Sequence, residues 1–155
     1  MKKLLIIGAV LFLAACSNEM SGETVTVCRT APSHRMPIAT DTVVTIEGMD
    51  EDIIVWTERI TVTPSEYSQF FWGFELDEDE IREAFEWYAN PVNGIGWRLI
   101  SLDANTLVFD AIYYYEDIPR SFLNEIWDPY DFENDVTLSS AIRGLEAQDA
   151  NCQTD

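Results

Sequence analysis

The sequence has no lysine beyond Lys3, and this absence excludes several classes of function. Its remaining basic residues are seven Arg, which face 28 Asp and Glu. Nucleic-acid binding needs clustered Lys or Arg opposite phosphates, so we expect no nucleic-acid partner. Docking of the folded domain on anionic lipid headgroups is disfavoured for the same reason. The acidic surplus favours solubility, with a cationic partner or divalent ions as the alternative interpretation.

Histidine is nearly absent too, which weakens the case for catalysis. The one histidine, His34, lies in a loop between Pro32 and Pro37. A Ser-His-Asp site would have to be built around it, whereas a lone loop histidine is more often just solvated. Many pairs of Asp and Glu could serve as the two carboxylates of a glycoside hydrolase, but the sequence does not give the distance in space between any two of them. We therefore predict that the protein is not an enzyme and uses no cofactor.

The acidic residues do not form a recognisable metal motif. Asp131, Glu133 and Asp135 alternate as the start of a calcium loop would. An EF-hand also needs Gly at its sixth position and Glu at its twelfth, and those places hold Val136 and Ile142. We predict no metal site, and these three acids are the candidates if a divalent ion binds in another way.

Apolar runs of spanning length are also missing. The uncharged stretch over residues 4–13 follows Lys2 and Lys3, and it is too short for a membrane-spanning helix, which needs about 20 residues. Small residues follow it at Ala14 and Ala15. This order predicts a signal peptide over residues 1–15, cleaved before Cys16. A signal peptide with a coincidental cysteine and a buried N-terminal helix are the alternatives.

The four residues 13–16, Leu-Ala-Ala-Cys, resemble the lipobox of bacterial lipoproteins. That resemblance implies that the Cys16 sulfur is diacylglycerylated and that Cys16 becomes the new N-terminus. It also implies an extracytoplasmic protein anchored in the cell membrane or the outer membrane through its acyl chains. Two such chains anchor stably, because each buried CH₂ contributes about 0.8 kcal/mol.

Only three cysteines are present, and lipidation of Cys16 leaves Cys28 and Cys152 as a pair. An exported protein meets oxidising conditions, so we predict a disulfide between them. Closing a loop of more than a hundred residues would add roughly 4 to 5 kcal/mol in the chain-entropy model. Two free thiols are the alternative, in a cell that leaves its surface proteins unoxidised.

The rest of the chain divides into a polar tether over residues 16–23 and a single domain over residues 24–155. Period-two alternation predicts several strands. They span residues 24–28, 42–47, 53–63, 97–102 and 106–115. In the third of these strands, Ile54, Trp56, Ile60 and Val62 share one face.

Helices are predicted from caps and periodicity. Asp77 is a good N-cap with Glu80 three residues on, and an apolar stripe at i, i+3, i+4, i+7 spacing begins at Ile81. Pro119 can start another helical turn. A last helix is expected over residues 138–147, capped by Thr137. The order of elements predicts an α+β fold, with an antiparallel sheet built from hairpins and two or three helices packed on one face.

The lipobox, a cysteine soon after the tether, a Thr-rich meander, an acid-capped helix and a second hairpin together resemble the YehR-like family of small bacterial lipoproteins. Residues 93–107 carry the closest likeness, a G-I-x-G turn followed by a strand, a turn and a strand. The resemblance supports the α+β fold and the anchoring. It implies no catalytic residues, because the biochemical role of that family is unassigned.

Aromatic residues are abundant, at 12% of the chain, and suggest a binding surface. We name Tyr67, Phe71, Trp72, Tyr113 and Tyr115 as a candidate groove for a peptide, glycan or small apolar ligand. Packing of these rings in the core is the alternative interpretation.

These observations favour a lipid-anchored, non-catalytic binding or interaction module. Its partner would be an envelope protein, a peptide, a glycan or a cationic molecule. The alternative is a lipid-anchored hydrolase that uses carboxylates or a bound divalent ion.

Overall fold

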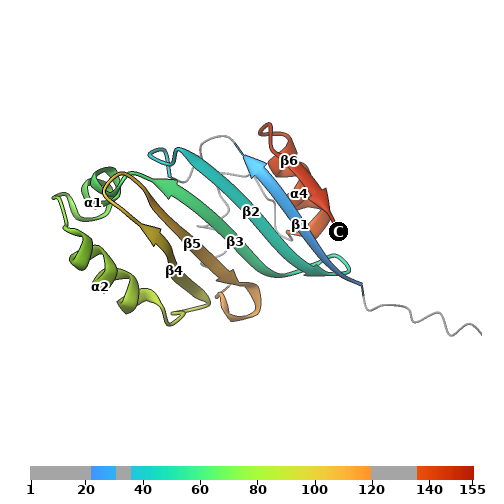
Figure 1. The fold of residues 1–155 in the computed structure, drawn as a ribbon. Coiled ribbons are helices and arrows are strands. Elements are labelled where there is room, and N and C mark those ends of the chain that lie inside the picture. Colours follow the sequence, from blue (N-terminus) through green and yellow to red (C-terminus); the bar gives the residue numbers. More distant parts are fainter. Residues whose placement is uncertain (1–21, 31–35, 120–135) are drawn as a thin grey trace, which may run out of the picture.

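The computed structural model describes residues 22–30, 36–119 and 136–155. In these residues an antiparallel sheet has the strand order β4-β5-β3-β2-β1-β6. Figure 1 shows α1 and α2 at the β4 end of the sheet and α4 at the β6 end. The predicted α+β class with an antiparallel sheet is confirmed.

The strands are β1 (Glu23–Thr30), β2 (Asp41–Met49), β3 (Asp52–Val62), β4 (Ile95–Leu102), β5 (Leu107–Tyr114) and β6 (Asn151–Thr154). The α-helices are α1 (Pro64–Trp72), α2 (Glu78–Tyr88) and α4 (Leu138–Glu146), and a 3-10 turn, η1, covers Tyr115–Asp117. Residues 120–135, where a helical turn after Pro119 was predicted, lie outside the described part.

The β2–β3 hairpin forms where the alternation predicted it, with one local difference. The register shifts between Glu47 and Gly48, so that Gly48 pairs with Ile53 while Glu47 pairs with Val55. This irregularity places Ile53 in the core at 6% exposure and leaves Ile54 only half-buried. The prediction that Ile54 shares the inner face was therefore wrong, because a bulge changes which residues face inward.

Both ends of α2 follow local sequence rules. Asp77 Oδ1 accepts from the Glu80 N–H at 2.9 Å, and Glu80 Oε2 accepts from the Asp77 N–H at 2.9 Å, which is the predicted capping box. After the helix, Asn93 and Gly94 both have positive φ. Two-residue turns of this kind favour Asn-Gly, and this one reverses the chain into β4.

Helix α1 was not predicted, although its start signal is present. The Thr63 hydroxyl accepts from the Glu66 N–H at 3.3 Å, and Pro64 occupies the first helical position. The helix ends at Gly73, whose φ of 75° is the left-handed conformation that glycine adopts without strain.

The core consists of two clusters. The first joins α4 to β1, β2 and β3, through residues that include Leu145, Ile46 and Trp56. The second joins α1 and α2 to β3 and β5, through residues that include Tyr67, Phe85 and Phe109. Both clusters draw on even-numbered residues of β3, and side chains alternate across a strand. The two clusters therefore continue along one side of β3.

The predicted disulfide between Cys28 and Cys152 is confirmed. The two residues face each other directly in the β1–β6 pairing. Cys28 is fully buried in the first cluster and Cys152 is partly buried against it. Beside the bridge, the hydroxyls of Thr26 and Thr154 hydrogen bond at 2.9 Å. The bridge therefore fastens the last strand of the chain to the first.

Candidate functional site

Large aromatic side chains are exposed on α1, on α2 and on the segment between them. Trp87 is 81% exposed and Phe74 is 58% exposed, values that are high for residues of this size. We call the whole set the aromatic surface. It consists of Phe70, Phe71, Trp72, Phe74, Trp87 and Tyr88.

The two helices expose these rings because each buries only a narrow face. In α1 the buried residues are Tyr67 and Ser68, so the three aromatic residues that end the helix stay outside. In α2 the buried residues are Ile81 and Phe85. Trp87 is two positions after Phe85, which places it off the buried stripe.

A pocket of about 470 Å³ opens in this surface. Its lining residues come from the end of α1, the connecting segment and the outer face of α2. They are Trp72, Phe74, Leu76, Glu80, Glu83, Ala84, Trp87 and Tyr88. Aromatic ring faces attract cations within about 6 Å, and carboxylates attract them further. The lining is therefore suited to a group that is both cationic and partly apolar.

A chain of ring contacts connects the aromatic surface to the core. The centroids of Phe71 and Trp97 are 5.1 Å apart, edge to face, and those of Trp97 and Phe109 are 5.5 Å apart, stacked. Tyr88 also contacts Trp97 at 5.7 Å. Phe109 is fully buried. These contacts restrain Phe71 and Tyr88, which reduces the entropy that a ligand must remove when it binds to them.

Beneath the surface, Tyr67 is buried at 1% exposure. Burial raises the pKa of its hydroxyl to about 12, although a hydrogen bond from Trp72 acts in the opposite direction. The hydroxyl is therefore neutral at physiological pH. Its bond to Trp72 links the base of the aromatic surface to the core.

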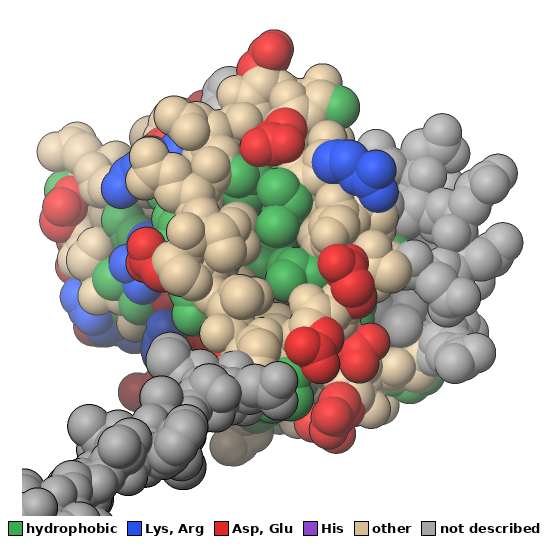
Figure 2. All heavy atoms as spheres, turned by 90° about the vertical axis from the view of Figure 1, so that its right-hand side faces the viewer, with side chains coloured by type: hydrophobic (Ala, Val, Ile, Leu, Met, Phe, Trp, Pro, Cys, Tyr) green, Lys and Arg blue, Asp and Glu red, His purple; other side chains and the backbone are tan. Residues whose placement is uncertain are grey.

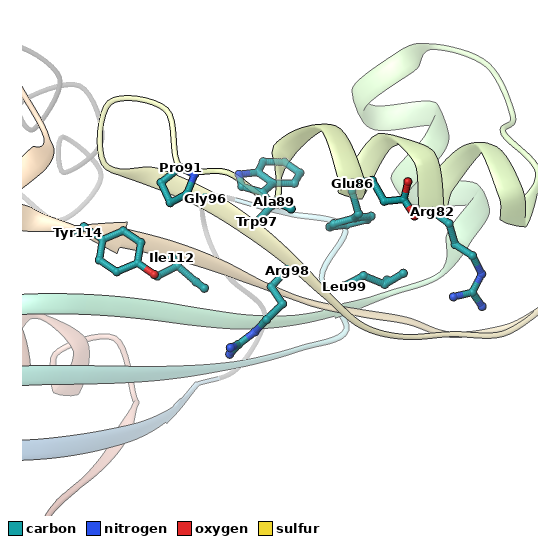
Figure 3. A pocket seen from close by; sticks show the side chains of 11 residues that line it. Arg82, Glu86, Ala89, Pro91, Gly96, Trp97, Arg98, Leu99, Ile112 and Tyr114 are labelled. Atoms are coloured by element: carbon teal, nitrogen blue, oxygen red, sulfur yellow. The ribbon is translucent and has the colours of Figure 1, made fainter.

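A second pocket, of about 450 Å³, lies on the other side of α2, between this helix and β4 (Figure 3). From α2 it is lined by Phe85, Glu86, Ala89 and Arg82, and from the sheet by Gly96, Trp97, Arg98, Leu99, Ile112 and Tyr114, with Pro91 at one end. We call it the β4 groove. Two arginines line the β4 groove. By contrast, the charged residues that line the pocket in the aromatic surface, which we call the aromatic pocket, are both glutamates.

The predicted groove residues lie in two places. Phe71 and Trp72 belong to the aromatic surface, and Tyr67 lies directly below with its ring centroid 5.0 Å from that of Phe71. Tyr113 packs against both core clusters, and Tyr115 packs against the first. The structure thus groups the first three residues and places Tyr115 with the α4 cluster.

Four residues of the aromatic surface were not among those named for the candidate groove. These are Phe70, Phe74, Trp87 and Tyr88. A signal existed for Trp87, because it falls outside the apolar stripe that begins at Ile81. Tyr88 continues that stripe yet is 47% exposed, since α2 ends there.

Other predicted site residues lie outside the described part of the chain. These are Cys16, His34, Asp131, Glu133 and Asp135. Within residues 22–30, 36–119 and 136–155, no three His, Cys, Asp or Glu side chains are grouped as metal ligands would be. No helix in those same ranges is long and apolar enough to cross a membrane.

Acidic side chains are spread widely over the surface. Figure 2 shows the side of the molecule on which β6 and α4 lie, where acidic groups surround a small hydrophobic area. Near α4, Glu51 accepts hydrogen bonds from the Ser139 hydroxyl and N–H, and they hold the pKa of its carboxyl below its usual value. The Glu51 carboxylate is thus charged at neutral pH.

Comparison with known proteins gives a likeness of fold. No family model matches the chain, and no curated protein matches it. Among solved structures, the chain is similar to the NMR structure of a protein from Streptococcus pneumoniae TIGR4, with a TM-score of 0.55 and 15% sequence identity. The match covers 99% of this chain and 97% of that one. At this identity, the likeness shows the fold alone.

Proposed function

We propose that the protein is a non-catalytic binding module, held at the outer side of a bacterial membrane by acyl chains on Cys16. Its binding site is the aromatic surface. The ligand we propose is a polypeptide segment that carries apolar side chains flanked by Lys or Arg. The single observation that carries this proposal is the exposure of six large aromatic side chains on two adjoining helices and the segment between them.

Monomeric proteins seldom expose large apolar patches, and patches of this kind usually mark a site where another molecule binds. Aromatic side chains are enriched at the centres of protein interfaces, where they supply much of the binding energy. Here Phe71 and Tyr88 are braced through Trp97 by ring contacts down to Phe109. A ligand would therefore meet a surface that is preformed at these two rings.

Charge selects the kind of partner. From Phe70 to Ala89 the sequence holds seven acidic residues and one basic residue, Arg82. Glu80 and Glu83 line the aromatic pocket itself. A Lys or Arg side chain in this pocket would meet ring faces and carboxylates together. An anionic partner would be repelled by the same groups.

The test uses the full chain in detergent micelles and two blocked peptides. One alternates Leu with Lys, and the other alternates Leu with Glu. We expect the Lys peptide to bind and shift tryptophan fluorescence, and the Glu peptide to leave it unchanged. Trp87→Ala should weaken binding by about thirtyfold or more, because such anchor residues carry at least about 2 kcal/mol. Glu83→Gln should weaken it less, and added salt should reduce that difference.

Ile100→Ala is the matched control, since Ile100 is a hydrophobic residue of β4 with 43% exposure that lines neither pocket. Its affinity for the Lys peptide should equal that of the wild type. Equal binding of the Lys and Glu peptides would contradict the proposal. Binding of a neutral oligosaccharide with higher affinity than the Lys peptide would replace it with a glycan site.

The proposal includes a scaffold in which α1, α2 and α4 cover one face of the sheet. It is supported by the two core clusters, which continue along one side of β3. Membership of the YehR-like family and the alternative of a lipid-anchored hydrolase both stay predictions.

A further inference from the structure

β4 lies at one edge of the sheet, and three of its residues, Ile95, Trp97 and Leu99, direct backbone groups away from β5. The Ile95 N–H and C=O both pair with Val92, on the side opposite β5, while the Gly94 C=O accepts from the Tyr114 N–H on the β5 side. The N–H and C=O of one strand residue point to the same side, and the side alternates along the strand. Trp97 therefore points its N–H and C=O to the free edge and Leu99 its N–H, just before the β4–β5 register shifts, and no residue in the described ranges pairs with these groups.

The β4 groove runs along this edge. It is lined by Trp97 and Leu99 from one face of β4, and by Arg98 from the other face. A pocket that touches both faces of one strand must pass its edge. Figure 3 shows α2 running beside β4, with Pro91 close to Gly96 at one end of the groove and Arg82 at the other.

Arg82 marks where the free edge ends. Its Nη2 donates to the Leu102 C=O at 3.4 Å, so a helix side chain already occupies that carbonyl. Between Pro91 and Arg82 the groove holds about 450 Å³. Exposed strand edges of this type accept an added strand, since the main-chain groups gain partners and adjacent pockets take alternate side chains.

We propose that an extended segment of another polypeptide adds to the sheet beside β4, between that strand and α2, and that it carries an acidic side chain. Arg82 and Arg98 line the groove with one acid, Glu86, and Arg98 shares the Asp110 carboxylate with Arg59, so these five charged groups sum to one positive charge. Arg82 and Arg98 are two of the five arginines in the described residues of a chain with a formal charge of −19. The groove is thus a locally basic site, distinct from the acidic aromatic surface, and this inference stands independently of the proposed function.

The probe is a blocked heptapeptide of alternating Val and Thr with one central Glu, added at millimolar concentration to the full chain in detergent micelles. Amide hydrogen exchange is followed by NMR. We expect exchange at Trp97 and Leu99 to slow by about tenfold or more as their N–H groups gain partners. The same peptide, N-methylated at the amides that would face β4, should give no slowing, because it cannot complete the ladder. A peptide with Lys in place of Glu should bind several-fold more weakly.

Variants and the opposite edge provide the controls. Arg82→Gln should weaken binding of the Glu peptide and leave binding of an otherwise identical Gln peptide unchanged. Leu99→Pro removes an N–H that points away from β5 and leaves the hydrogen bonds between β4 and β5 intact. The variant should therefore fold and fail to bind the Glu peptide. Unchanged exchange at Trp97 and Leu99 with saturating peptide, or equal binding of the N-methylated peptide, would overturn the proposal. If the peptide slows amide exchange equally at β6, the other edge of the sheet, the peptide pairs with strand edges nonspecifically and the proposal of a specific site beside β4 is wrong.

Discussion

Arg59 donates two hydrogen bonds to the carboxylate of Asp110, from Nε to Oδ1 at 2.8 Å and from Nη2 to Oδ2 at 3.1 Å. Arg98 donates a third, to Oδ2 at 2.6 Å. The register places the three residues side by side across β3, β5 and β4. Asp110 is fully buried while both arginine side chains stay half or more exposed. One buried acid therefore joins three neighbouring strands.

This arrangement predicts a loss of stability in acid. Burial by itself would raise the pKa of Asp110, but the hydrogen bonds from Arg59 and Arg98 outweigh it and hold the pKa below its ordinary value of 3.8. Because the pKa of Asp110 is lower in the folded state than in the unfolded state, its ionised carboxylate stabilises the fold at pH values above the unfolded-state pKa. This stabilisation is lost as the pH falls through the folded-state pKa. We expect Asp110→Asn to lower the free energy of unfolding at neutral pH by about 1 to 3 kcal/mol, a value reduced by the exposure of the arginines.

Urea unfolding at several pH values measures this effect. The difference between wild type and Asp110→Asn should shrink below about pH 4, as the wild-type carboxyl becomes protonated. Glu47→Gln removes the same charge from an exposed position on β2 and should change stability by less than about 0.5 kcal/mol. A difference that stays constant down to the lowest pH would contradict the ion-pair explanation.

Reducing the Cys28–Cys152 bridge should destabilise the protein strongly. The bridge joins residues 124 positions apart, and a loop of this length is worth about 4 to 5 kcal/mol in the chain-entropy model. Urea unfolding with and without a thiol reductant gives the difference. The double variant Cys28→Ala, Cys152→Ala should unfold at the same urea concentration in both conditions. If the wild type unfolds at the same urea concentration with and without the reductant, the bridge adds no stability.

Alkaline titration should reveal one unusual tyrosine. The chain has six tyrosines, and burial raises the pKa of Tyr67 to about 12. Because the folded pKa is raised, the fold keeps its full stability below the unfolded pKa of 10.0 and loses stability as the pH rises towards 12. Ultraviolet absorbance should show one tyrosine titrating last. That step should vanish in Tyr67→Phe, and its persistence there would assign it to another residue.

Glycine 94 should tolerate substitution less than glycine 73, although both have φ near 75°. A Cβ on Gly94 would lie 2.7 Å from the Tyr114 carbonyl oxygen and 2.9 Å from the backbone of Asp117, whereas a Cβ on Gly73 meets nothing within 4 Å. Gly73→Ala isolates the cost of positive φ, about 1 kcal/mol. Gly94→Ala should cost at least about 1 to 3 kcal/mol more, because backbone must move. Equal melting temperatures for the two variants would contradict this.

Membrane association should depend on one residue. Cys16→Ser removes the sulfur that would carry the diacylglycerol, so we expect the protein to move from the membrane fraction to the soluble fraction. Incorporation of labelled palmitate should be lost at the same time. Ser17→Ala, which changes the adjacent hydroxyl only, should leave both properties intact. A Cys16→Ser protein that still sediments with membranes would contradict lipid anchoring at this position.

The elements that the sequence predicted well are those set by neighbouring residues. The capping box at Asp77 and Glu80 and the reversal at Asn93 and Gly94 depend on residues at most three positions apart. By contrast, β6 has four residues and no alternation, so only its pairing with β1 makes it a strand. Helix α1 escaped prediction because its outward aromatic residues blur the apolar stripe, even though Thr63 caps it.

The candidate site was predictable in kind but only partly in position. The run of aromatic residues indicated a binding surface near Phe71 and Trp72, and both are exposed. Tyr115 could not be assigned from the sequence, because its surroundings depend on α4, which follows it in the chain by more than twenty residues. The β4 groove has no sequence signal either, since it depends on strand order and on where α2 lies.

The position of β1 has a mechanical consequence. A pull on the N-terminal end of the chain reaches the domain through β1, which pairs with β2 along its length and with β6 on its other side. To slide out, β1 would have to shear its ladder with β2 and drag β6 with it through the Cys28–Cys152 bond. A tether at Cys16 would therefore load the β1–β2 ladder along its whole length, together with a covalent bond to the last strand.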